Sequence, residues 1–364
     1  MQTIVKYILV SFFFLLTPFS FGQNTGDKFV VVLDAGHGGK DPGRPTKFDT
    51  EKKIALSIVL KLGKILETHN DIKVIYTRKT DVFIELHERA AIANKADADL
   101  FVSVHCNAHH TQAYGTETYV LSLSNTGRNF EIAKAENEVI FLEDDHEKNY
   151  EGFDPNSPES LIGLTLMQED YVEQSILLAR FVEDNFKNNL KRKSRGIKQI
   201  SLWVMHNTYM PSVLIETGFL TNKKEGAYLS SKKGQNQMAN SISGAILKYK
   251  ESLNTSFDNS VVIEDVIDAE IALIPSPEII FKVQIAAGSR KLETKSYNFK
   301  GLKGIAIEKI GNGYKYFYGE TSNYAKIKEQ RAEARKKGYS SCFIVAYKDG
   351  EKISVKEALK TFSN

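Results

Sequence analysis

Residues 29–39 read FVVVLDAGHGG, an apolar run that ends in a glycine-rich turn carrying His37. Such a run indicates a buried strand that opens into a loop. Two later segments have the same form, DLFVSVHCNA at 99–108 and VLIETGFLTN at 213–222. Between them lie helix-like stretches, above all 51–67, in which apolar residues recur on one face. Strands that alternate with such helices predict an α/β fold with a mostly parallel twisted sheet flanked by helices.

Length and composition suggest more than one domain. The chain has 364 residues, is 42% hydrophobic and carries a net charge of +3 with both signs well mixed. That balance lacks the basic stripe of a nucleic-acid-binding protein, so no nucleic-acid partner is expected. We expect a large α/β domain at 27–250, interrupted by an insertion at 125–160. A linker at 251–277 and a small α+β, ferredoxin-like domain at 278–350 follow it.

The N-terminus resembles an export signal. Lys6 precedes an apolar run from Tyr7 to Phe21, and the small residues Ser20 and Gly22 follow its centre. We predict a signal peptide at 1–22 that is cleaved after Gly22. A membrane anchor is the alternative, but the run is shorter than the roughly 20 residues that a spanning helix needs. The mature protein is therefore expected in the periplasm or secreted to the cell envelope, without a stable membrane span.

Metal-competent side chains follow the strands. His37 comes just past the first strand, Glu51 opens the first long helix, and His105 ends the strand that begins at Leu100. Residues past the carboxyl ends of strands in an α/β sheet converge on one crevice. The two cysteines, Cys106 and Cys342, are expected to be buried apolar residues, so a metal would be bound by histidine and carboxylate. Two imidazoles and one carboxylate make an open three-ligand Zn2+ site.

A second carboxylate, Glu216, follows the buried strand near 213–215 and precedes Gly218. Placed beside a zinc site, it can accept a proton from water and return it to a leaving amine. His109 and His110 are expected near the site, as supporting residues at most. Arg78 and Asp81 are expected to form a structural pair.

These motifs together resemble the N-acetylmuramoyl-L-alanine amidase family over about 29–249. The resemblance rests on DAGHGG, on Glu51, on YTRKTD followed by ERAAIANKADADLFVSVHCNA, and on PSVLIETGFLTN. It implies that His37, Glu51 and His105 bind zinc, and that Glu216 is the catalytic acid and base. The implied reaction is hydrolysis of the amide between N-acetylmuramic acid and L-alanine in peptidoglycan, in cell separation or wall remodelling. A non-catalytic peptidoglycan-binding protein, a zinc carboxypeptidase and a polysaccharide deacetylase are the alternatives.

The tail, with FKVQIAAG at 281–288 and GYSSCFIVAY at 338–347, resembles the sporulation-related repeat (SPOR) domain. The resemblance implies a βαββαβ-like domain that binds glycan strands stripped of stem peptides. Tyr316 and Tyr318 are candidates for stacking on sugars, although Phe317 must then face the other way. A small ferredoxin-like domain of unknown role is the alternative.

The insertion at 125–160 contains a helix candidate at 129–141 with three carboxylates, Glu131, Glu136 and Glu138. Some members of the family that the chain resembles carry such an insertion as an autoinhibitory helix. A carboxylate from it would occupy the open zinc position, and an activator protein acting on the insertion would reopen the site. An ordinary surface excursion is the alternative.

Overall fold

The computed structural model describes residues 28–44, 46, 49–121, 127–150, 153–154, 156, 171–255, 279–288, 290–310, 313–339 and 341–361. The expected signal peptide and most of the expected linker lie outside these residues. No helix in the described ranges combines the length and the apolar character needed to cross a membrane.

The larger unit is built on a six-stranded sheet with the order β2-β1-β3-β6-β4-β5. Its strands are β1 (Phe29–Ala35), β2 (Ile72–Tyr76), β3 (Leu100–Asn107), β4 (Thr116–Leu121), β5 (Ser194–Ile200) and β6 (Ser212–Phe219). Neighbouring strands are parallel except where β4 pairs antiparallel with β6. The expectation of an α/β unit with a mostly parallel sheet is therefore confirmed, with one antiparallel pair added.

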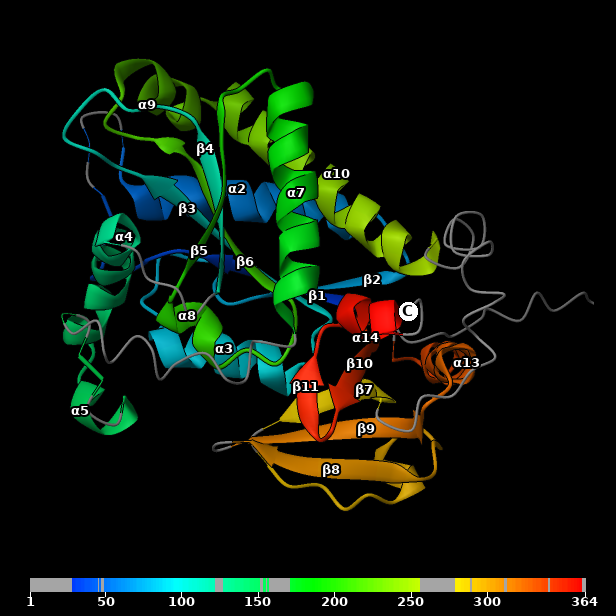
Figure 1. The fold of residues 1–364 in the computed structure, drawn as a ribbon. Coiled ribbons are helices and arrows are strands. Elements are labelled where there is room, and N and C mark those ends of the chain that lie inside the picture. Colours follow the sequence, from blue (N-terminus) through cyan, green and yellow to red (C-terminus); the bar gives the residue numbers. More distant parts are fainter. Residues whose placement is uncertain are drawn as a thin grey trace, which may run out of the picture.

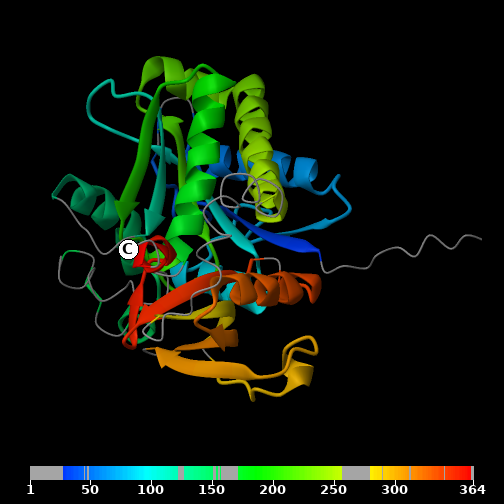
Figure 2. The same ribbon diagram turned by 45° about the vertical axis from the view of Figure 1, so that its right-hand side comes forward.

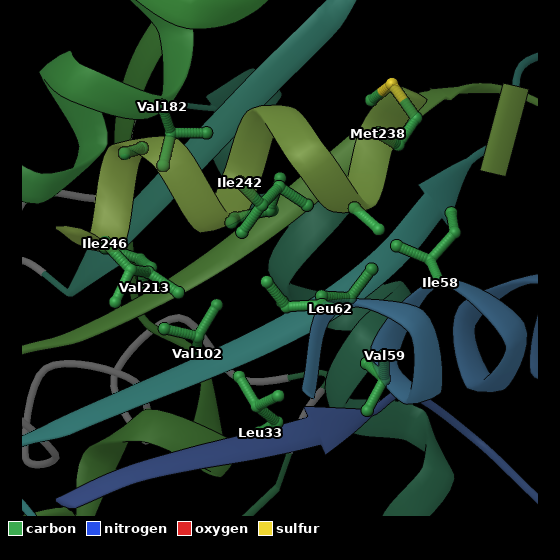
Figure 3. Close-up of a cluster of buried hydrophobic side chains, with 14 of the residues drawn as sticks. Leu33, Ile58, Val59, Leu62, Val102, Val182, Val213, Met238, Ile242 and Ile246 are labelled. Atoms are coloured by element: carbon green, nitrogen blue, oxygen red, sulfur yellow. The ribbon is translucent and has the colours of Figure 1, made fainter. Parts of the chain in front are cut away.

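Helices cover both faces of this sheet because strand side chains alternate between the faces. On β1, Val31 and Leu33 belong to one core and Val32 to the other. The first core is covered by the three long helices α2, α7 and α10 (Figures 1 and 3). Of these, α7 and α10 lie side by side in Figure 2. Among the described residues, the helices of this unit outside the insertion are α2 (Glu51–Leu66), α3 (Leu86–Lys95), α7 (Val172–Asn188), α8 (Trp203–His206), α9 (Lys223–Ser230) and α10 (Lys232–Thr255).

The insertion is part of the second core, together with α3 and α8. It forms α4 (Gly127–Asn137), the 3-10 helix η1 (Glu138–Leu142) and α5 (His146–Asn149). Its buried apolar residues in this core are Ala133, Val139, Ile140 and Tyr150. The helix expected at 129–141 is thus present, but it tightens into a 3-10 turn at Glu138.

The tail forms a second, antiparallel sheet with the order β11-β10-β7-β9-β8 and a core of its own (Figure 1). Its elements are β7 (Ile279–Gly288), η3 (Ser296–Asn298), β8 (Ile305–Ile310), β9 (Gly313–Thr321), α13 (Tyr324–Lys336), β10 (Phe343–Lys348), β11 (Glu351–Ile353) and α14 (Val355–Thr361).

Two expectations for the tail need correction. Between β7 and β8 the described residues contain only the short 3-10 helix η3, where the resemblance implies a full helix. Tyr316 is 1% exposed and belongs to the tail core, so it cannot stack on a sugar. Its hydroxyl donates to Arg290 O and accepts from Leu292 N, which fixes this tyrosine inside the domain.

The two units touch next to the start of α7. Tyr171 precedes that helix, and its hydroxyl lies 3.1 Å from the amide nitrogen Nε2 of Gln284 on β7. The Tyr171 ring also meets the Phe343 ring of β10 edge to face, with centroids 5.4 Å apart. A cleft of about 350 Å3 lies between the units at this point.

Candidate metal centre

Four side chains singled out from the sequence converge near the carboxyl ends of the central strands. His37 follows β1 by two residues, and Glu51 is the first residue of α2. His105 on β3 and Glu216 on β6 are register partners on adjacent parallel strands. His37 Nε2 and His105 Nδ1 lie 3.1 and 3.3 Å from Glu51 Oε1. The sheet therefore brings two imidazoles and one carboxylate to a single point.

The Glu51 carboxylate is 1% exposed and is held by the backbone on both oxygens. Cys106 N donates to Oε1 at 2.9 Å, and Arg44 N donates to Oε2 at 3.0 Å. Gly43 lets the loop pass this close, because a Cβ there would lie 2.7 Å from Glu51 Oε2. Burial alone would raise the pKa of Glu51, but His37 and His105 hold it well below its usual range. The side chain is thus an oriented anion.

The two imidazoles each point a buried nitrogen at this anion without forming a hydrogen bond. On His37, the opposite nitrogen Nδ1 lies 2.7 Å from Asp41 Oδ2. A carboxylate on Nδ1 leaves the Nε2 lone pair of the neutral ring free for a metal. Burial lowers the pKa of His37, but the Glu51 charge and Asp41 outweigh it and raise that pKa to about 9, so a bound metal would take the place of the Nε2 proton. Three converging donor atoms, two of them ring nitrogens without a hydrogen-bond partner, fit a divalent cation such as zinc.

Glu216 is 2% exposed, and its Oε2 has no hydrogen-bond partner among the described residues. Burial, and then the nearby Glu136 charge, raise the pKa of Glu216 well above its usual range. On the neighbouring strand β4, the register partner of Glu216 is Glu117. Glu117 accepts hydrogen bonds from Arg195 Nε at 3.2 Å and from Asn107 Nδ2 at 2.9 Å. Glu216 is therefore the carboxyl of this site suited to hold and release a proton.

The insertion places one of its three candidate carboxylates in the site. Glu136 Oε2 lies 3.3 Å from His105 Nδ1 and 3.9 Å from His37 Nε2. Glu131 is exposed, and Glu138 lies 3.8 Å from Lys134 on the surface. The cavity beside Glu136 measures about 20 Å3, which is room for about one water. The insertion therefore covers the site in this conformation.

Two further insertion residues cap helices of the larger unit. Glu143 Oε1 accepts from Leu86 N at 2.8 Å, at the start of α3. Asn137 Oδ1 accepts from Trp203 N at 2.9 Å, at the start of α8. Neither helix has a cap from its own N-cap side chain. The insertion thus satisfies helix ends that would otherwise leave buried N–H groups unpaired.

Other residues noted in the sequence lie outside the cluster. Asp81 forms an ion pair with Lys52 at 2.8 Å, so the expected Arg78–Asp81 pair is wrong. Arg78 instead binds backbone carbonyls beneath His37. His109 and His110 are exposed on the loop after β3 and do not reach the cluster.

Residues 31–248 match the family model described as N-acetylmuramoyl-L-alanine amidase (Amidase_3). The chain belongs to this family. The N-acetylmuramoyl-L-alanine amidase AmiA from Escherichia coli K12 is 32% identical to this chain over 228 residues, which cover 62% of this chain and 78% of that protein. An endolysin of Bacillus phage SPP1 is 35% identical over 210 residues, 58% of this chain and 62% of that protein.

A solved N-acetylmuramoyl-L-alanine amidase from Clostridium difficile 630 is 28% identical and aligns with a TM-score of 0.47. The alignment covers 62% of this chain and 98% of that structure. The family assignment supports an N-acetylmuramoyl-L-alanine amidase that acts on peptidoglycan. The matched residues include the whole of the candidate metal centre and the described part of the insertion.

Proposed function

We propose that this protein is a zinc-dependent amidase that hydrolyses the bond between N-acetylmuramic acid and L-alanine. The observation that carries the proposal is the convergence of His37 Nε2, His105 Nδ1 and Glu51 Oε1 without hydrogen bonds between them. Zinc held by these three atoms would supply Lewis acidity toward the amide carbonyl and the attacking water. Two imidazoles and one carboxylate are a donor set typical of such hydrolases.

Glu216 then carries the proton in the proposed reaction. Its carboxylate takes a proton from the attacking water as the C–O bond forms, and returns it to the alanine nitrogen as the C–N bond breaks. Burial and the absence of a partner on Oε2 support this role, because the proton is not shared with another side chain. Asp41 keeps the His37 ring oriented throughout.

The metal assignment is tested by zinc content and product analysis of the purified protein. We expect about one zinc per chain, lost in His37→Ala and His105→Ala and retained in the exposed control His110→Ala. Digestion should free stem peptides that begin with alanine. Released acetate would favour a deacetylase, and release of only the last stem residue would favour a carboxypeptidase. Zinc retained in both ligand variants would contradict the site.

Glu216→Gln keeps the shape of the side chain and removes its proton transfer. It should keep zinc and lose roughly a hundred- to ten-thousand-fold in turnover. The exposed Glu88→Gln is the matched control and should stay near the parent rate. Near-parent turnover of Glu216→Gln would assign the proton transfer to another group.

We further propose that the insertion at 125–160 is autoinhibitory and that an activator protein moves it. The position of Glu136 beside both imidazoles supports this, since its carboxylate would take the open position on a metal held by them. Glu136→Ala should raise basal activity on peptidoglycan, while Glu138→Ala, on the exposed surface, should not. Equal rates for Glu136→Ala and the parent would leave the insertion with a purely structural role.

The tail is proposed to be a SPOR-like domain that binds denuded glycan. The strand order β10-β7-β9-β8 supports this, because it is the order of a split βαβ sheet with a fourth strand beside the first. Full-length Glu216→Gln should sediment with amidase-treated glycan more than with intact sacculi, and a form ending at residue 255 should lose that preference. Together with the expected signal peptide, we propose that the enzyme acts in the periplasm, in cell separation or wall remodelling.

A further inference from the structure

Buried guanidinium groups bind three consecutive carbonyl oxygens just before and at His37. Arg78 donates through Nε to Ala35 O at 2.9 Å and through Nη2 to Gly36 O at 2.7 Å. Arg89 donates through Nη1 to Ala35 O at 2.8 Å and through Nη2 to His37 O at 2.9 Å. The turn that carries His37 is therefore fixed by hydrogen bonds from two buried guanidinium groups.

This arrangement is costly for the folded protein, since Arg78 and Arg89 are only 3% and 1% exposed and carry like charges. Arg89 is balanced by Asp34 at 2.8 Å. Arg78 has no ion pair within 4 Å among the described residues, and burial together with the Arg89 charge lowers its pKa to about 10. Planar guanidinium groups suit a row of carbonyls because each presents several donors in fixed directions, which an ammonium does not.

The turn needs such support because His37 has a left-handed backbone with φ +60. A residue with a Cβ adopts this conformation at an energetic cost, so the surroundings must favour it. The preceding Gly36 packs against the other ligand, since a Cβ there would lie 2.5 Å from the His105 ring. Any relaxation of the turn would therefore move His37 relative to His105.

We propose that Arg89, assisted by Arg78, is a positioning residue that sets metal affinity by holding His37 in its left-handed conformation. The proposal rests on the metal site proposed above. Arg89 does not touch the donor atoms themselves; it acts through the His37 carbonyl. It comes from α3, 52 residues further along the chain, so the ligand turn and this helix are functionally one unit.

The test compares two variants that disturb the same buried network. Arg89→Lys keeps a positive charge near Asp34 but cannot bind both carbonyls. Thr77→Val removes the 2.6 Å hydrogen bond to Asp34 and keeps every hydrogen bond between the arginines and the ligand turn. Zinc affinity of the full-length protein is measured by competition with a chromogenic chelator, next to the melting temperature of the metal-free protein.

We expect Arg89→Lys to weaken zinc binding by roughly 10- to 100-fold, with activity that recovers at saturating zinc. Thr77→Val should lower the melting temperature of the metal-free protein without a comparable loss of zinc affinity. If Arg89→Lys does not fold, Arg78→Lys tests the proposal in its place, because it leaves the Asp34–Arg89 ion pair intact. Arg78→Lys should also weaken zinc binding.

Two results would overturn the proposal: parent-like zinc affinity in the folded arginine variant, or an equal loss in Thr77→Val. His37→Ala separates this failure from failure of the proposed function. If His37→Ala loses zinc while Arg89→Lys keeps it, only the positioning role is wrong. If the parent and His37→Ala bind zinc equally, the metal site itself is wrong.

Discussion

Glu143→Ala tests whether the insertion is a structural part of the catalytic unit. The Glu143 side chain is fully buried at the start of α3, where Oε1 accepts from Leu86 N at 2.8 Å. Its other oxygen accepts a short hydrogen bond from the Tyr150 hydroxyl at 2.5 Å. Alanine would remove both acceptors and leave two buried donors without a partner.

The expected loss follows from these two contacts. Each buried donor left unpaired costs about 1–3 kcal/mol, and loss of a helix cap by itself costs about 1 kcal/mol. We therefore expect Glu143→Ala to lower the free energy of unfolding by about 3 kcal/mol. An exposed insertion carboxylate such as Glu138, substituted in the same way, should change it by less than about 0.5 kcal/mol.

The chain itself supplies the assay, because Trp203 is its only tryptophan. Trp203 lies in α8, and its ring meets the Tyr150 ring with centroids 4.7 Å apart. Its fluorescence during urea unfolding therefore reports the contact between the insertion and the catalytic unit. If Glu143→Ala lowers the free energy of unfolding by less than about 1 kcal/mol, the reasoning is refuted, because that is less than the cost of one buried donor left without a partner. It would also favour an insertion that rests loosely on the domain.

Three further predictions follow from buried groups. Burial lowers the pKa of His206 to about 4 from 6.5, so the unfolded chain binds its proton first as the pH falls. His206 should therefore contribute a loss of about 2 kcal/mol in stability between pH 7 and 5, and His206→Gln should remove that contribution from the urea-midpoint profile. Gly36→Ala should abolish zinc binding because its Cβ would lie 2.5 Å from the His105 ring, whereas Gly288→Ala, with no atom within 4 Å of its Cβ, should not. Leu33→Ala, at a fully buried site, should cost about 2–5 kcal/mol in the same unfolding assay.

Much of the site could be reached from sequence because sheet geometry is regular. Parallel strands end at a common edge, so a histidine after β1 and another near the end of β3 had to lie near one another. Glu216 followed from the same rule, being register-paired with His105. The residue types at these positions suggest metal chemistry without any knowledge of their side-chain angles.

The positions of the supporting residues could not be predicted from sequence in this way. Glu131, Glu136 and Glu138 are chemically equivalent in the sequence, and only the packing of α4 decides that Glu136 faces the imidazoles. The pairing of Asp81 with Lys52 rather than Arg78 depends on which groups share the space below the turn.

The sequence by itself determined the alternation of strands and helices, and with it the edge where the chemistry-bearing residues gather. Those features depend on local periodicity and on residues close to strand ends. The tertiary structure alone decided that Arg89 holds the His37 carbonyl and that Glu143 caps α3. Such contacts join segments 52 and 57 residues apart. They depend on side-chain directions fixed only when helix and sheet pack together, and no local pattern encodes those directions.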